Sequence, residues 1–173
     1  EWKRVVDVNL MGVVHGCRAF VPILKRQGSG AVPRRIVNVA SLAGLVHLPG
    51  MSTYNATKAA VVALSETLRA ELAADGIGVS VVCPSFFKTN LIESMAPSTS
   101  ADVIAQAKKL VNESGISADV IAGRVVKAVE RGEFLVLTHR DGAAAWMIKR
   151  MIPTSAWAFL LDAASKRVSS ENA

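Results

Sequence analysis

Residues 35–41 read Arg-Ile-Val-Asn-Val-Ala-Ser, and this stretch decides the fold class of the chain. Residues 35–40 are largely apolar and rich in β-branched side chains, which is typical of a strand buried in a parallel sheet. A glycine-containing loop is expected from Ser41 to Gly50. The alanine-rich run from Ser52 to Asp75, closed by Gly76, then predicts a long helix.

The same alternation of helix and strand continues on both sides of this stretch. Residues 2–26 carry apolar and small side chains at helical spacing, with Pro22 near the last turns. Further strands are expected at 77–83 and 134–138. The remaining expected elements are loops at 27–34 and 84–100 and helices at about 101–113, 118–131 and 142–167, the last divided near Pro153. Together they predict an α/β fold with a doubly wound, Rossmann-like parallel sheet.

The composition is that of one ordinary globular domain with a buried core. The chain has 173 residues, of which 51% are hydrophobic and 20% charged, and this excludes intrinsic disorder. Two cysteines are too few for a disulfide scaffold. No stretch of about 18 uncharged apolar residues occurs, so no transmembrane helix is expected. Glu1 is followed at once by what looks like helix interior, and we therefore expect the chain to be N-terminally incomplete.

The charged residues and the candidate metal ligands indicate neither a nucleic-acid site nor a metal site. The net charge of +6 comes from scattered Lys and Arg residues with few aromatic neighbours, which favours solvated surface charge. Cys17 and Cys83 lie in apolar sequence without metal-ligand spacing and indicate buried thiols in a reducing compartment, the cytoplasm. The three histidines are isolated in the sequence and are expected to be structural or surface residues; they are His15, His47 and His139.

Three polar residues follow the first predicted strand at an informative spacing. Ser41 comes directly after it, Tyr54 thirteen residues later, and Lys58 four residues beyond Tyr54. Residues four apart share one face of a helix, so Tyr54 and Lys58 project side by side. An adjacent ammonium would lower the pKa of the tyrosine, which could then exchange a proton with a hydroxyl or carbonyl oxygen. A tyrosine and a lysine at this spacing are by themselves usually an ordinary surface pair. Their combination with the strand, the serine and a second strand ending at Pro84 is much rarer by chance.

This combination resembles a short-chain dehydrogenase/reductase of the classical type. The resemblance runs from residue 1 to about 138. Its segments are Val8-Asn9-Leu10-Met11-Gly12-Val13, Val37-Asn38-Val39-Ala40-Ser41, Tyr54-Asn55-Ala56-Thr57-Lys58-Ala59-Ala60 and Val81-Val82-Cys83-Pro84.

The resemblance implies a catalytic role for four residues. Tyr54 would be the general acid/base, and Lys58 would lower its pKa and hydrogen-bond the nicotinamide ribose. Ser41 would orient and polarise the substrate oxygen. Asn9 would hold a helix bend and a water that links Lys58 to solvent, although an asparagine inside a helix can equally bond locally.

The resemblance also implies a cofactor site that the sequence carries only in part. Besides Tyr54 and Lys58, the loop after the second strand would contact the nicotinamide through Pro84, the Phe87 backbone and the Thr89 hydroxyl, unless it is a plain loop. Ser85 stands where the family usually has glycine. The family's Gly-rich turn, which cradles pyrophosphate, does not occur in the sequence, so the choice between NAD and NADP cannot be read from it.

We therefore expect one domain over residues 1–173, with a core at 1–138 and a helical tail at 139–173. It is predicted to be the catalytic portion of an NAD(P)-dependent oxidoreductase that interconverts an alcohol and a ketone or aldehyde. These residues alone are expected to be inactive, with an unpaired apolar edge at 35–40. The alternatives are a non-catalytic binding protein of the same fold, a basic nucleic-acid-binding domain, and a hydrolase. Ala40-Ser41-Leu42 disfavours the hydrolase because the Gly-x-Ser-x-Gly elbow is absent.

The expected partners are a small apolar substrate and a second copy of the chain. The substrate would lie against the loop at 86–100 and apolar residues that could equally be core, namely Leu42, Leu45, Leu48 and Met51. A homodimer or homotetramer would form through the helices at 2–26 and 52–75, whose small-residue face carries Ala56, Ala60, Ala63, Thr67 and Ala70. The tail could cap the cleft, pack on its own domain or a partner subunit, or lie on a membrane surface.

Overall fold

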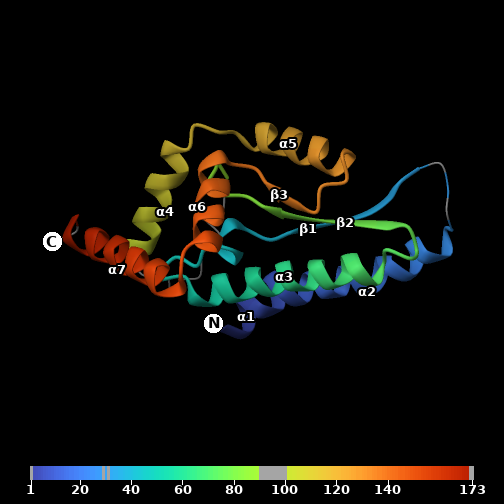
Figure 1. The fold of residues 1–173 in the computed structure, drawn as a ribbon, viewed down its shortest axis with the longest axis horizontal. Helices are drawn as coiled ribbons and strands as arrows, with labels where there is room; N and C mark the ends of the chain where they lie inside the picture. The colour runs from blue at the N-terminus through green and yellow to red at the C-terminus, as the bar shows by residue number, and fades with distance from the viewer. Residues whose placement is uncertain (1, 29, 31, 90–100, 172–173) are drawn as a thin grey trace.

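The centre of the molecule is a three-stranded parallel sheet with helices on both faces (Figure 1). A computed structural model describes residues 2–28, 30, 32–89 and 101–171. The strands are β1 (Arg34–Val39), β2 (Ile77–Cys83) and β3 (Leu135–Leu137), and they lie in the order β1-β2-β3. Both pairings are parallel. The α/β class and the parallel sheet predicted from the sequence are confirmed.

Helices connect the strands and extend beyond them. They are α1 (Trp2–Val6), α2 (Gly12–Arg26), α3 (Ser52–Glu71), α4 (Ala101–Glu113), α5 (Ala118–Glu130), α6 (Arg140–Met151) and α7 (Thr154–Glu171). A π-helical turn, η1 (Asp7–Met11), joins α1 to α2, and a 3-10 turn, η2 (Leu42–Gly44), follows β1. The helical tail divides near Pro153, as expected, into α6 and α7. Pro22 lies inside α2, which continues to Arg26.

The two faces of the sheet bury alternate side chains of the strands. Ile36 and Val79 pack toward α2 and α3, while Val82 and Val136 pack against Ala128 of α5 on the other face. Figure 1 shows α2 and α3 running together along one side of the strands and α5 on the opposite side. This two-sided covering is the doubly wound arrangement that the alternation of elements predicted.

A buried polar chain joins α2, β1 and α3 inside this core. The Cys17 thiol donates to the Asn38 side-chain oxygen at 3.7 Å, and the Asn38 amide donates to the Ser65 hydroxyl at 2.9 Å. Ser65 in turn donates to the carbonyl of Val61 at 2.7 Å. Buried polar groups are stable when they are satisfied in this way, so the chain ties both helices to the strand that leads to Ser41.

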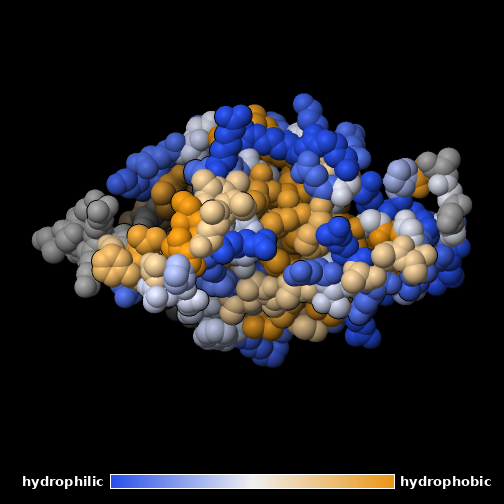
Figure 2. Space-filling view, viewed as in Figure 1, coloured by the Kyte–Doolittle hydropathy of each residue, from blue (hydrophilic) through white to orange (hydrophobic). Residues whose placement is uncertain are grey.

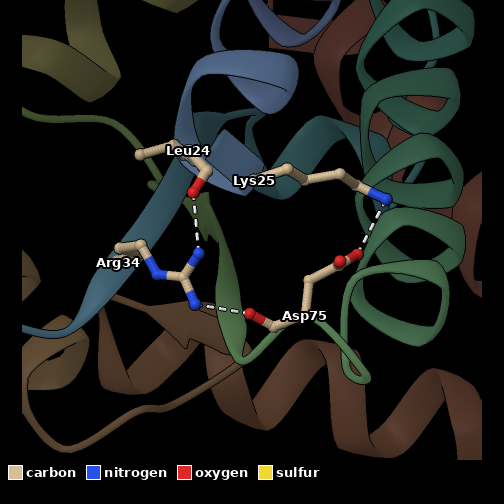
Figure 3. Close-up of polar contacts among 4 residues, drawn as sticks. All are labelled: Leu24, Lys25, Arg34 and Asp75. Carbon is tan, nitrogen blue, oxygen red and sulfur yellow. Dashed lines mark hydrogen bonds and ion pairs between the residues drawn. The ribbon is translucent and has the colours of Figure 1, made fainter. Parts of the chain in front are cut away.

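At the amino-terminal ends of the strands, Arg34 of β1 connects this strand to α2 and to the turn before β2 (Figure 3). Its guanidinium donates to the carbonyl of Leu24, at the end of α2, at 2.7 Å and to the carbonyl of Asp75, in the turn before β2, at 2.5 Å. Lys25 forms an ion pair with the Asp75 carboxylate at 2.7 Å beside it. Arg34 thus satisfies carbonyls that a helix end and a tight turn leave free.

One edge and part of one face of the sheet remain open. Within the described residues β1 pairs only with β2, and its side chains Val37 and Val39 are 39% and 55% exposed. Figure 2 shows an apolar area in the middle of the face in view, where the strands run. The unpaired apolar edge expected at residues 35–40 is therefore present. None of the helices in the described part of the chain is long and apolar enough to cross a bilayer.

Candidate active site

Ser41 lies where β1 ends, beside the end of β2. Its hydroxyl accepts a hydrogen bond from the Ala43 N–H at 3.2 Å, which caps the η2 turn, and it donates to the Pro84 carbonyl at 3.5 Å. The backbone N–H of Leu42 donates to the same carbonyl at 2.8 Å. The carboxyl ends of parallel strands meet at one edge, so residues 43 positions apart in sequence become neighbours.

Tyr54 and Lys58 reach the same place from the first turns of α3. The Lys58 ammonium lies 5.7 Å from the centre of the Tyr54 ring and donates to the carbonyl of Val39, the last residue of β1, at 3.2 Å. The Ser41 hydroxyl lies close enough to the Tyr54 phenol to act on its pKa. Ser41, Tyr54 and Lys58 therefore converge, as their spacing predicted. Beyond Lys58 the same face of α3 points into the core, where Val61 is fully buried.

The pKa of Tyr54 departs from the sequence-based expectation. Burial raises the pKa of Tyr54, and the neighbouring Ser41 hydroxyl only partly offsets this. Burial also lowers the pKa of Lys58. Both shifts favour the uncharged forms, because removal from water disfavours a phenolate and an ammonium alike. The expectation that the neighbouring ammonium lowers the tyrosine pKa is therefore wrong for this structure: burial raises the pKa of Tyr54, and the group that acts to lower it is Ser41.

Asn9 and Thr57 link the π-helical turn to α3. Asn9 lies within η1, and its amide donates to the Thr57 hydroxyl at 3.4 Å. Thr57 is buried, stands next to Lys58, and lies within hydrogen-bonding distance of the carbonyls of Thr53 and Tyr54, at 3.0 and 2.9 Å. Asn9 therefore contacts the helix that carries Tyr54 and Lys58 through Thr57. Thr57 was not predicted from the sequence, although its place between Tyr54 and Lys58 could have indicated it.

The loop after β2 begins at the candidate site. Pro84 accepts the hydrogen bonds from Ser41 and Leu42. Phe87 is half-buried, whereas Thr89 is exposed. Residues 90–100, part of the expected substrate-facing loop, lie outside the described residues. The structure thus joins Pro84 directly to the catalytic candidates.

Cys83 forms part of the floor of the site at the end of β2. Its side chain is 1% exposed, and burial raises the pKa of the thiol to about 12. Ser41 and Lys58 both act on this thiol in the opposite direction. Cys83 is therefore a protonated, apolar component of the site at neutral pH.

The loop between Ser41 and Met51 is held from two directions. The Lys149 ammonium of α6 donates to the Leu45 carbonyl at 2.5 Å and lies 3.2 Å from Nδ1 of His47. From α3, the Asn55 amide donates to the Leu48 carbonyl at 2.7 Å. The start of the tail therefore packs on its own domain, beside the candidate site.

Only some of the apolar residues expected to face substrate are available for that role. Leu45 is 4% exposed and belongs to the core, which is one of the two roles that the sequence left open for it. Leu42 is partly buried against the same core. Leu48 is 36% exposed. Core and pocket residues share one composition here, and burial alone distinguishes them.

The fold and the site together define an α/β protein whose Ser, Tyr and Lys side chains meet at the carboxyl end of a parallel strand. The family model for short chain dehydrogenases matches residues 1–100. This chain belongs to the short-chain dehydrogenase family.

The comparisons with individual proteins agree with this assignment. The chain is 35% identical over 160 residues to the "Probable oxidoreductase EphD" of Mycobacterium tuberculosis, which covers 88% of this chain and 26% of that protein. A short-chain dehydrogenase/reductase from Burkholderia phymatum in complex with NAD has a TM-score of 0.79 and 32% identity, covering 87% of this chain and 57% of that one. A short-chain dehydrogenase from Burkholderia cenocepacia in complex with NADP has a TM-score of 0.71 and 26% identity, with 93% and 59% covered. The chain thus spans between a quarter and three fifths of the length of these proteins.

Proposed function

We propose that the protein is an NAD(P)-dependent oxidoreductase that interconverts an alcohol and a ketone or aldehyde. The observation that carries the proposal is the convergence of Ser41, Tyr54 and Lys58 at the carboxyl end of β1. The oxidoreductase name of one relative, and the NAD and NADP bound by two structural neighbours, support it.

The donors at the site fit the nicotinamide half of such a cofactor. An ammonium has three N–H donors. Among the described residues Lys58 donates one hydrogen bond, to Val39, which leaves two donors for ribose hydroxyls. The proposed site is completed by Tyr54, Pro84, the Phe87 backbone and the Thr89 hydroxyl. NAD or NADP would supply the hydride that adds to the carbonyl carbon of the substrate.

The proposed proton transfer follows from the protonation state of Tyr54. Because burial raises its pKa, the phenol keeps its proton at neutral pH. This is the form that protonates a carbonyl oxygen during reduction. Ser41 lies beside Tyr54, and its single hydroxyl proton, which points to the Pro84 carbonyl at 3.5 Å in this structure, would turn to the same substrate oxygen. In the reverse direction the positive charge of Lys58 would stabilise the phenolate.

Asn9 is proposed to act on the site through the backbone and a relay. It lies in the π-helical turn and bonds Thr57, the residue before Lys58. π-helical turns are frequent at functional sites because they aim side chains that a regular helix would turn away. The contact would fix the start of α3, and a water beside it would carry protons from Lys58 to solvent.

The substrate class that the site supports is a small apolar alcohol or carbonyl compound. Leu48 is partly exposed on the loop after Ser41, and Phe86 and Phe87 are half-buried on the loop after β2. These side chains could contact apolar groups of the substrate while Ser41 and Tyr54 hold its oxygen.

A homodimer or homotetramer is the proposed assembly. On α3, the small residues Ala56, Ala63, Thr67 and Ala70 are exposed in the single chain. The adjoining helices α1 and α2 carry exposed Trp2 and Phe20, at 56% and 62%. A two-fold pairing of these helices would bury apolar surface that the chain itself leaves in water.

The test is Tyr54→Phe in the longest form of the protein that its gene encodes. Loss of the phenol proton should lower kcat about a hundredfold or more, in line with general acid catalysis, while NADH or NADPH binding measured by fluorescence persists. Wild-type turnover in this variant would refute the assigned role. Cofactor binding without any turnover by the wild-type protein would instead favour a non-catalytic binding protein. The 173-residue chain alone is expected to be inactive, because its sequence carries no Gly-rich turn.

A further inference from the structure

A single peptide unit connects His139 to Ser41. The unit between Pro84 and Ser85 presents its N–H to Nδ1 of His139 at 3.3 Å. Its carbonyl accepts from the Leu42 N–H at 2.8 Å and from the Ser41 hydroxyl at 3.5 Å. A peptide unit is planar and rigid, so the orientation of its N–H also sets the orientation of its carbonyl.

The contacts of His139 identify its tautomer. The Ser85 N–H can only donate, so Nδ1 must accept and carries no proton. The Thr138 hydroxyl lies 2.8 Å from the same nitrogen and therefore donates to it as well. The ring proton is then on Nε2, which is buried and has no hydrogen-bond partner within the part of the chain that the structure describes. His139 itself is only 7% exposed, so solvent does not readily replace these contacts.

We propose that His139 is a positioning residue for Ser41, acting through the Pro84–Ser85 peptide. As a neutral acceptor it holds the peptide N–H, and the carbonyl of that peptide then accepts the Leu42 N–H on the opposite side, which fixes the backbone that carries the Ser41 hydroxyl. The catalytic consequence rests on the proposed function, whereas the contact itself does not. His139 lies between β3 and α6, at the start of the tail formed by residues 139–173, so this part of the tail would take part in positioning Ser41.

Protonation of His139 would undo this arrangement. A proton on Nδ1 would face the Ser85 N–H, so two donors would oppose each other. Thr138 can turn its hydroxyl to accept from Nδ1–H, but the backbone N–H cannot. Burial lowers the pKa of His139; Asp141 on α6 acts to raise it, Arg124 on α5 to lower it, and the backbone of Phe86 to raise it. The release of the peptide is therefore expected below pH 6.5.

Nuclear magnetic resonance on the 173-residue chain tests the contact without any need for turnover. Ring ¹⁵N shifts at pH 7.5 should place the proton of His139 on Nε2. His139→Leu should speed exchange of the Ser85 amide about tenfold or more, while the Val81 amide in β2 serves as an internal control. His139→Asn, whose side-chain oxygen can replace Nδ1, should keep exchange within about threefold of wild type. A proton on Nδ1, or unchanged Ser85 exchange in His139→Leu, would overturn the proposal.

A kinetic experiment on the longest form of the protein tests the consequence for Ser41. His139→Leu should lower kcat about tenfold with little change in KM, because displacement of a positioned group affects mainly the transition state. His139→Asn should restore kcat, and should remove the loss of rate that the wild type shows as His139 is protonated. Equal kcat values for the Leu and Asn variants would contradict positioning by hydrogen bonding. Failure of Tyr54→Phe to lose activity would refute the proposed function and leave the Ser85 exchange result standing.

Discussion

The two hydrogen bonds of Arg34 offer a direct test of how the amino-terminal ends of the strands are held. We expect Arg34→Met to destabilise the chain by removing both hydrogen bonds to the carbonyls of Leu24 and Asp75 (Figure 3). Methionine keeps most of the apolar stem of arginine, so the substitution isolates the guanidinium. The turn before β2 and the end of α2 would lose the group that connects them.

The size of the effect follows from the burial of the acceptors. Hydrogen bonds to a charged donor contribute about 1.5 to 3 kcal/mol each when the partners stay dry. Leu24 and Asp75 are only partly buried, and water can replace the guanidinium at both carbonyls. We therefore assign about 1 kcal/mol to each bond and about 2 kcal/mol to Arg34→Met in total. The neighbouring Lys25–Asp75 ion pair has side chains 45% and 33% exposed, so Lys25→Met should cost less than about 1 kcal/mol.

Urea denaturation followed by circular dichroism measures both variants. The midpoint for Arg34→Met should fall with no change in the dependence on urea, because the surface exposed on unfolding is the same. Lys25→Met is the matched control, since it removes a charge at the same corner without freeing a backbone carbonyl. An Arg34→Met variant as stable as Lys25→Met would refute the reasoning.

Two further predictions concern the candidate site. An added Cβ at Gly44 would lie 2.6 Å from the Lys58 carbonyl oxygen, so Gly44→Ala should lower the free energy of unfolding by about 3 kcal/mol in urea denaturation. An added Cβ at Gly142 would meet the flexible end of the Leu42 side chain at 3.0 Å, so Gly142→Ala should change the free energy of unfolding by less than about 1 kcal/mol. Equal effects of the two substitutions would contradict this difference. The pKa of Cys83 is raised from 9.0 to about 12, so the unfolded thiol ionises first and stability should fall as pH rises above 9, by about 1 kcal/mol between pH 9 and 10. Denaturation of Cys83→Ala over the same range should lack this loss, and an equally steep decline would show that the thiol is not its source.

Features with a local or periodic signal were predictable from the sequence. The strand at 77–83 and the start of the helix at 52 follow from β-branched runs, helical spacing and the turn residues that bound them. The convergence of Ser41, Tyr54 and Lys58 was predictable as well, because a parallel strand and the helix after it place their ends in a known relation. The direction of the Tyr54 pKa shift was not predictable from the sequence, because it depends on how far the folded chain removes the phenol from water.

Contacts between distant segments were decided by the tertiary structure alone. The His139–Ser85 bond spans 54 residues and the Lys149–Leu45 bond spans 104, and no spacing rule relates such positions. The same holds for Leu45, whose side chain could have faced substrate and instead lies in the core. The sequence by itself determined the family, the order of helices and strands, and the candidate catalytic residues, because these depend on local pattern. Which side chains hold those residues in place depends on packing, and packing is settled only when the whole chain excludes water.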